Sequence, residues 1–171
     1  NYLGAPVFNA DEAGKNALVQ ENIISEIRKH FGEKMLHSNG NINTTLLADI
    51  VFADKNQLHL LTNITHPFIK EKFQEWKDKQ TYNYVILDAA ILLESELLKN
   101  IADIIIYIES PIELRLQRVM ARNQWTKEHI IQRMQMQKHY TELNIQPHYI
   151  IQNDNTKLLF PQLLKIHEAY M

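Results

Sequence analysis

The chain contains no cysteine and very little glycine. The absence of cysteine among its 171 residues excludes a disulfide framework and a thiolate metal site. Glycine occurs only at positions 4, 14, 32 and 40, where average usage of about 7% would give about a dozen. Since phosphate-binding loops are built from glycine, this shortage predicts that the 171 residues hold no complete loop of that kind.

Long apolar runs and blocks of one charge are also missing. The longest apolar runs, 84–93 and 101–108, are strand-sized and fall short of the roughly 20 residues that cross a bilayer. The net charge is -2, with both signs interspersed. Nucleic acid is therefore not expected as the main partner, because phosphate backbones need clustered Lys and Arg. Together with the lack of cysteine, these features favour a cytoplasmic protein that does not enter membranes.

The apolar residues that are present, 45% of the chain, suffice for one core and predict an α/β fold. Four β-rich runs are expected to form strands: 5–8, 82–87, 103–108 and 149–151. The last three lack clean alternation, which is typical of parallel strands covered on both faces. Helical patterns fill the intervals, and the long stretch 12–79 is expected to be helical and free of strands. It would form a lobe inserted between two strands.

Several helix starts carry local signals. Asn9 is a capping residue with Glu12 three positions later, and Thr126 can cap a helix after a break in the chain. Pro111 follows Ser110 at the start of a third helix. A further helix is expected to start near Thr65, where His66 could contact a substrate or cap the helix.

Two aspartates end predicted strands or begin the helices after them. Asp11 lies one turn into a helix at the carboxyl end of the first strand, the edge at which open α/β sheets bind ligands. It could accept a proton from a substrate hydroxyl, or it could simply favour the helix dipole. Asp88 ends the apolar run 84–87, as in strands whose terminal Asp organises magnesium around nucleotide phosphates. An ordinary turn at the end of a strand is the alternative.

Arginines are spaced along two helices. Arg115, Arg118 and Arg122 fall on one helix face, where guanidinium groups could converge on phosphate oxygens. The next helix carries Arg133 and Gln137 one turn apart. Helix, break and helix with arginines on both arms suit a lid over a polyphosphate, and a solvated cationic hairpin is the alternative.

Other motifs fail. Lys15 follows Gly14, but a phosphate loop would need glycine where Asn9 stands and Ser or Thr where Asn16 stands. Lys15 is therefore expected on a helix surface or against a substrate. No histidine pair has zinc-like spacing, and no Ser or Cys lies in a nucleophile signature.

Six regions of the chain carry patterns that occur together in one enzyme family. They are LGAPVFNAD at 3–11, IVF at 50–52 with NITHP at 63–67, DAAILLE at 88–94, RVMARN at 118–123, RMQMQ at 133–137 and YIIQN at 149–153. In this order they resemble the dephospho-coenzyme A kinases across essentially the whole chain. The differences are Asn9 and Asn123 where the family has Asp, Ala90 where it has Pro, and Gln152 in the last strand.

The resemblance implies a P-loop NTPase-like kinase that transfers the γ-phosphoryl group of ATP, with Mg²⁺, to the ribose 3′-hydroxyl of dephospho-coenzyme A. Asp11 would be the general base, and three arginines would neutralise the transferred group: Arg118, Arg122 and Arg133. Lys15, His66 and Gln137 would contact the acceptor. Asn153 would lie near adenine, and Asp88 would hold magnesium through water.

The family pattern also implies a division of the chain. Residues 1–14, 80–118 and 147–171 would form the nucleotide-kinase core, 15–79 the lobe that binds dephospho-coenzyme A, and 119–146 the lid. A strand, a glycine-rich GK-[ST] loop and a helix are expected ahead of residue 1, and their strand would be the fifth of the sheet. The alternatives are another small-molecule kinase, such as a nucleoside monophosphate kinase, or a binding module without catalysis. The sequence leaves the oligomeric state open.

Overall fold

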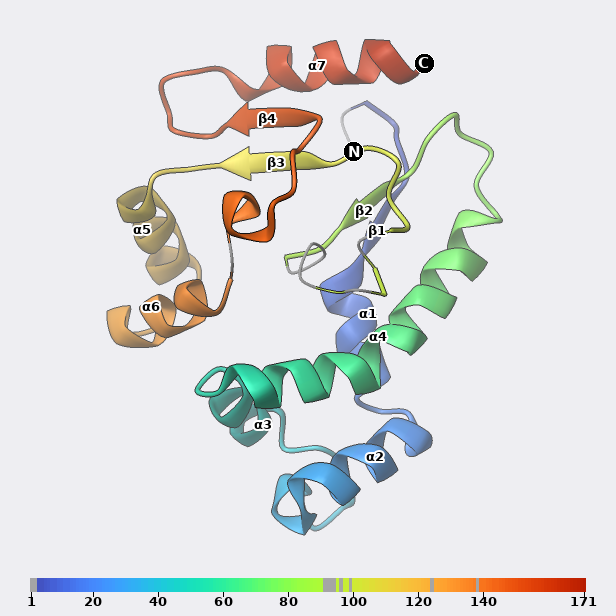
Figure 1. Ribbon diagram of the computed structural model, residues 1–171, viewed down its shortest axis with the longest axis vertical. Helices are drawn as coiled ribbons and strands as arrows, with labels where there is room; N and C mark the ends of the chain where they lie inside the picture. The colour runs from blue at the N-terminus through green and yellow to red at the C-terminus, as the bar shows by residue number, and fades with distance from the viewer. Residues whose placement is uncertain (1–2, 91–94, 96, 99, 124, 138) are drawn as a thin grey trace.

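The computed structural model describes residues 3–90, 95, 97–98, 100–123, 125–137 and 139–171 (Figure 1). Its strands are β1 Val7–Asn9, β2 Ile86–Asp88, β3 Ile106–Glu109 and β4 Tyr149–Gln152. Its helices are α1 Ala10–Ala17, α2 Glu21–Phe31, η1 Glu33–Met35, α3 Thr44–Val51, α4 Lys55–Lys77, α5 Ile112–Asn123, α6 Lys127–Met136, η3 Tyr140–Leu143 and α7 Leu159–Tyr170. None of the described helices combines the length and apolarity needed to cross a membrane.

The four predicted strands are confirmed, and each ends one residue later than expected. β1 pairs with β2 in parallel, from Val7 opposite Ile86 to Asn9 opposite Asp88. β3 pairs with β4 in parallel, from Ile106 opposite Tyr149 to Glu109 opposite Gln152. Within the described part of the chain these strands form two separate pairs rather than one continuous sheet. The predicted α/β class with parallel strands and flanking helices is confirmed.

Local capping follows the sequence at two predicted helix starts. The Asn9 side chain caps α1 by accepting a hydrogen bond from the Glu12 backbone N–H at 2.8 Å. Thr126 caps α6 by accepting one from the His129 N–H at 3.3 Å. The region 12–79 is helical as predicted, and its one described β feature is an isolated bridge between Leu36 and Ile42.

The helix start predicted at Thr65 is wrong, because Thr65, His66 and Pro67 all lie inside α4. Pro67 lacks an N–H and so cannot donate to the carbonyl one turn earlier. The helix continues because its apolar face on both sides of the proline is packed, with Ile69 and Phe73 buried beyond it. Figure 1 shows α4 changing direction in its middle, as expected at a proline.

Two apolar clusters hold the fold together, and α4 joins them. The larger cluster lies within the helical lobe: Ala17, Ile23, Ile27, Phe31, Met35, Ile42, Leu47 and Val51. The smaller cluster joins α1 to α4 and the segment after β2: Ala10, Ala13, Ile69 and Leu98. The first half of α4 packs Leu58 and Leu61 on the lobe cluster, and its second half packs Ile69 on α1. α4 thereby fixes α1 between the lobe and the strands.

The lobe cluster should dominate the stability of the helical region. Ile27 is fully buried, so Ile27→Ala removes apolar contacts and leaves a cavity, and we expect it to lower the free energy of unfolding by about 2–5 kcal/mol. Val19, which is 65% exposed, provides a control, and Val19→Ala should change stability little. Urea unfolding followed by circular dichroism measures both. Equal effects of the two substitutions would contradict this assignment of the core.

Candidate active site

Two carboxylates meet at the carboxyl ends of β1 and β2. Asn9 and Asp88 lie opposite each other in the strand register, and Asp11 follows two residues later in the first turn of α1. Partial burial, and then the charge of Asp88, raise the pKa of Asp11 above its ordinary value. Lys15, one turn further along α1, and the Ala90 backbone N–H act in the opposite direction. The structure therefore brings together three of the predicted residues: Asp11, Lys15 and Asp88.

Helix capping and possible acid–base chemistry belong to different side chains at this site. The side chain that caps α1 is that of Asn9. Asp11 keeps an exposed part, although partial burial, and then the charge of Asp88, raise its pKa. A carboxylate with a raised pKa is a stronger base, and its exposed side can receive a hydroxyl group. The site can therefore take a proton from an incoming alcohol.

Arg118 is held at the ends of β3 and β4. Its guanidinium donates to the Ser110 hydroxyl at 3.3 Å, to the Asn153 carbonyl at 3.2 Å and to the Asn155 side-chain oxygen at 2.8 Å. The Asn153 N–H in turn donates to the Glu109 carbonyl at 2.8 Å. Arg118 thus fastens α5 to the loop after β4, and both backbone polar groups of Asn153 are fixed at this edge.

The predicted residues of the lid have contacts of their own. Arg122 is exposed, and its Nε donates to the Asn123 side-chain oxygen at 2.8 Å. The guanidinium carbon of Arg133 lies 4.1 Å from the ring centre of Phe52. Gln137 is exposed at the end of α6. Among the described residues, the three predicted arginines share no hydrogen-bond partner.

His66 lies in the interior. Only 7% of it is exposed, and its Nδ1 lies 2.7 Å from the hydroxyl oxygen of Ser95, which is equally buried. The same oxygen accepts a hydrogen bond from the Leu98 N–H at 3.2 Å. Burial, and then the charge of His59, lower the pKa of His66 to about 4, so the ring is neutral at pH 7. The described contacts of His66 join α4 to the segment that follows β2.

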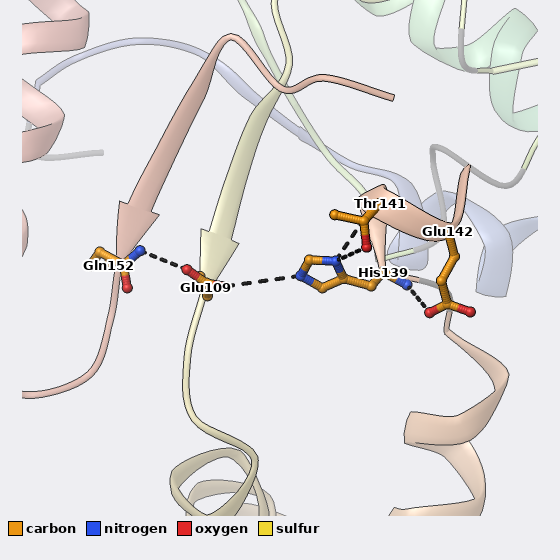
Figure 2. A network of polar contacts seen from close by, with 5 residues as sticks. All are labelled: Glu109, His139, Thr141, Glu142 and Gln152. Carbon is orange, nitrogen blue, oxygen red and sulfur yellow. Dashed lines mark hydrogen bonds and ion pairs between the residues drawn. The ribbon is translucent and has the colours of Figure 1, made fainter. Parts of the chain in front are cut away.

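A second polar network, which sequence reasoning missed, lies at the end of β3 (Figure 2). Glu109 accepts a hydrogen bond from the Gln152 side-chain amide at 2.6 Å, and its other oxygen lies 4.0 Å from Nε2 of His139. The His139 N–H donates to the Glu142 carboxylate at 2.9 Å. The network ties the chain returning from α6 to the ends of β3 and β4. The sequence signal for this network was Glu109, directly after the predicted strand 103–108. Its partners could not be predicted, because they lie more than twenty residues away in the chain.

The parallel α/β core, the carboxylate at the carboxyl ends of its strands and the two arginine-bearing helices fit a small-molecule phosphotransferase of the P-loop kinase class. More particularly, the sequence model described as dephospho-CoA kinase matches residues 1–158, and the chain belongs to that family. This confirms the resemblance found in the sequence.

Known relatives cover most of the chain. A dephospho-CoA kinase of Bacteroides fragilis strain YCH46 is 32% identical over 166 residues, which are 96% of this chain and 80% of the relative. One from Fusobacterium nucleatum is 34% identical over 73% of this chain and 64% of its own.

Among solved structures, a dephospho-CoA kinase from Campylobacter jejuni has a TM-score of 0.59 and 26% identity, covering 100% of this chain and 89% of its own. The structure of TT1252 from Thermus thermophilus has a TM-score of 0.81 over 98% of this chain and 85% of its own. At 24% identity, TT1252 supports the fold alone.

The buried His66 predicts a loss of stability in acid. Because its folded pKa, about 4, lies below the ordinary value of 6.5, the unfolded chain binds the additional proton first as pH falls. Stability should therefore be fully present above pH 6.5 and decline between 6.5 and 4. The loss from this group should amount to roughly 3 kcal/mol.

The variant His66→Asn tests this origin, because an amide can occupy the position of Nδ1 without titrating. We expect lower stability at pH 7 but a shallower decline between pH 6.5 and 4, measured by urea unfolding at several pH values. The exposed His37 supplies the control variant His37→Asn, which should keep the original decline. An unchanged decline in His66→Asn would assign the acid sensitivity to other groups.

Proposed function

We propose that Asp11 is the general base of this dephospho-CoA kinase. The family's reaction is the ATP-dependent last step of coenzyme A biosynthesis. In the proposed step, the ribose 3′-hydroxyl of dephospho-coenzyme A gives its proton to Asp11 as its oxygen bonds to the γ-phosphorus, and the bond to the leaving ADP oxygen breaks. The observation that carries the proposal is the position of Asp11 beside Asp88, with a raised pKa, at the carboxyl edge of the strands.

Lys15 and the lid arginines would supply positive charge around this step. Lys15 lies near Asp11, and its charge opposes the rise in the pKa of that carboxyl. Arg122 and Arg133 would approach the transferred group from the lid, and Gln137 would contact the acceptor from the end of α6. Charge stabilisation and positioning dominate phosphoryl transfer, so these side chains need not make or break bonds.

Arg118 and His66 would act partly through the residues to which they are hydrogen-bonded, Asn153 and Ser95. Arg118 donates to the Asn153 carbonyl, which supports a role of Asn153 in an adenine site built at the end of β4. Its remaining donors could still meet phosphate oxygens after the lid moves. For His66, a substrate contact would require the ring to leave Ser95, so its hydrogen bond favours an indirect contribution at the acceptor side.

Magnesium fits the carboxylates at this edge. No cluster of three or more possible ligands occurs among the described residues, but Mg²⁺ is typically held by one or two carboxylates with substrate phosphates and waters. Asp88, exposed at the end of β2, would hold it through water. When bound, the ion would neutralise charge on the ATP phosphates.

A phosphate loop from outside these 171 residues would complete the site. The two strand pairs do not join within the described chain, and apolar residues of β2 and β3 are exposed: Ile86 by 39%, Ile106 by 39% and Ile108 by 61%. A further parallel strand and the helix after it would cover such residues. We propose that this strand leads into the family's glycine-rich loop.

The finer organisation follows from the same proposal. Residues 15–79 would bind dephospho-coenzyme A and 119–146 would close over ATP, with the remainder forming the core. ATP and dephospho-coenzyme A would be the partners, without a nucleic-acid ligand. The cytoplasm is the proposed location, because it supplies ATP and suits a chain without cysteine.

Replacing the proposed base should slow the chemical step. In the full-length encoded protein, we expect Asp11→Asn to lower kcat about 100-fold or more, the scale of lost general-base catalysis, with little change in the KM for dephospho-coenzyme A. The neighbouring Glu12→Gln removes an exposed carboxylate from the same helix and should leave kcat near normal. A coupled assay for ADP measures both. Normal turnover of Asp11→Asn would exclude it as the base.

The acceptor is tested by comparing substrates. Full-length protein should phosphorylate dephospho-coenzyme A with a kcat/KM at least about 100-fold above that for AMP, CMP or UMP, because discrimination by hydrogen-bonded groups commonly reaches this size. Rates with each acceptor at fixed ATP give the ratio. Preference for a nucleoside monophosphate would overturn the proposed acceptor.

A further inference from the structure

Arg133 contacts aromatic rings from two different parts of the chain. Its guanidinium carbon lies 4.1 Å from the ring centre of Phe52 and 4.2 Å from that of Trp125. Phe52 directly follows α3 in the helical lobe, and Trp125 immediately precedes Thr126, the cap of α6. Both distances fall within the range of a cation–π interaction. One guanidinium therefore connects the helical lobe to the arm that carries α6.

The contacts also remove water from this side chain. Nε of Arg133 is buried and has no hydrogen-bond partner among the described residues. Burial lowers the pKa of Arg133, and the nearby carboxylate of Asp49 on α3 opposes the change. Guanidinium is weakly hydrated and stacks well on aromatic groups, so it loses little when ring faces replace water. The attraction to the two rings therefore holds the Arg133 side chain in place.

We propose that Phe52 and Trp125 are positioning residues for Arg133 in phosphoryl transfer. The two rings hold the guanidinium so that its in-plane N–H groups meet phosphate oxygens, a role that rests on the proposed function. The ring of Phe52 comes from the proposed acceptor-binding lobe. Occupation of that lobe and placement of a lid cation are then linked through one side chain.

The geometry suits this task. The N–H groups of guanidinium project in its plane, so rings over its faces leave those donors for anions. Aromatic neighbours also lower the local polarity, which strengthens charge-assisted hydrogen bonds to phosphate. A flexible arginine must lose rotamer freedom on binding, and one already held by rings loses less.

The test compares shape-conserving substitutions in the full-length protein. Phe52→Leu removes the ring and keeps an apolar side chain, whereas Phe52→Tyr keeps the ring. We expect Phe52→Leu to lower kcat between about 3-fold and 30-fold, the range of a cation–π contact, and Phe52→Tyr to stay near normal. Trp125→Leu and Trp125→Phe should repeat the contrast. Phe68→Leu is the matched control, since Phe68 is a half-buried aromatic packed on the same lobe cluster, and the cation over its ring is Lys72 rather than Arg133.

A double-mutant comparison with Arg133→Ala shows whether Phe52 positions Arg133 or only supports the fold. In an Arg133→Ala background, Phe52→Leu should have no further effect on kcat, because the side chain it positions is gone. Additive effects, or a kcat for Phe52→Leu equal to that for Phe68→Leu, would overturn the inference. The proposed base is judged separately by Asp11→Asn, so the inference can fail while that role stands. If Arg133→Ala alone leaves kcat unchanged, both the charge role of Arg133 and its positioning are refuted.

A spectroscopic measurement gives a second readout. With Trp76→Phe, Trp125 becomes the sole tryptophan of these 171 residues, and the change in emission on its own replacement by Phe isolates its signal, which reports the neighbouring guanidinium. Arg133→Lys and Phe52→Leu should each shift this emission and reduce its response to added dephospho-coenzyme A, whereas Phe68→Leu should not. An emission insensitive to both Arg133→Lys and Phe52→Leu would contradict the proposed contact.

Discussion

The parallel pairing of β1 with β2 is the constraint on which the candidate site depends. Backbone hydrogen bonds, including one of 2.9 Å from the Ile86 N–H to the Pro6 carbonyl, set the register that places Asn9 opposite Asp88. Once that register is fixed, a helix capped by Asn9 must present Asp11 beside Asp88. The resulting repulsion between like charges is unfavourable, and the packing of Ala13 against Ile69 in the core helps to offset it. A slip of one residue would separate the pair.

The second strand pair imposes a different kind of order. Here polar side chains, rather than an apolar cluster, join the strand ends to the helices around them. Arg118 reaches the loop after β4, and Glu109 reaches both Gln152 and His139. Polar and charged groups therefore organise the ends of β3 and β4, whereas close-packed apolar residues organise the helical lobe. Polar attachments can exchange partners with a ligand at less cost than a packed core can rearrange.

Local signals in the sequence were sufficient for the strands and the caps. Buried strands need apolar runs, and a cap acts over three residues, so both features are visible within a short window. The patterns shared with dephospho-CoA kinases favoured the role of general base for Asp11, whereas spacing alone left that role and a helix-dipole role open. The structure adds that Asn9 supplies the cap, and that burial, and then the charge of Asp88, raise the pKa of Asp11.

The features that escaped prediction involve partners distant in the chain. The hydrogen bond between His66 and Ser95 and the contact between Arg133 and Phe52 each join different elements. No local sequence pattern around one residue indicates which residue is its partner. Pro67 misled for another reason. Proline usually marks a helix boundary, but tertiary packing of the residues beyond it outweighed the missing hydrogen bond.

The bend of α4 at Pro67 has a consequence for how the molecule can diversify. The half of α4 before the proline belongs to the lobe cluster, and the half after it belongs to the cluster beneath α1. Substitutions in the lobe can be absorbed on one side of the bend without disturbing the packing on the other. The helical lobe and the packing beneath Asp11 are thus separable units that share a single helix, and selection can revise the lobe while leaving the surroundings of Asp11 in place.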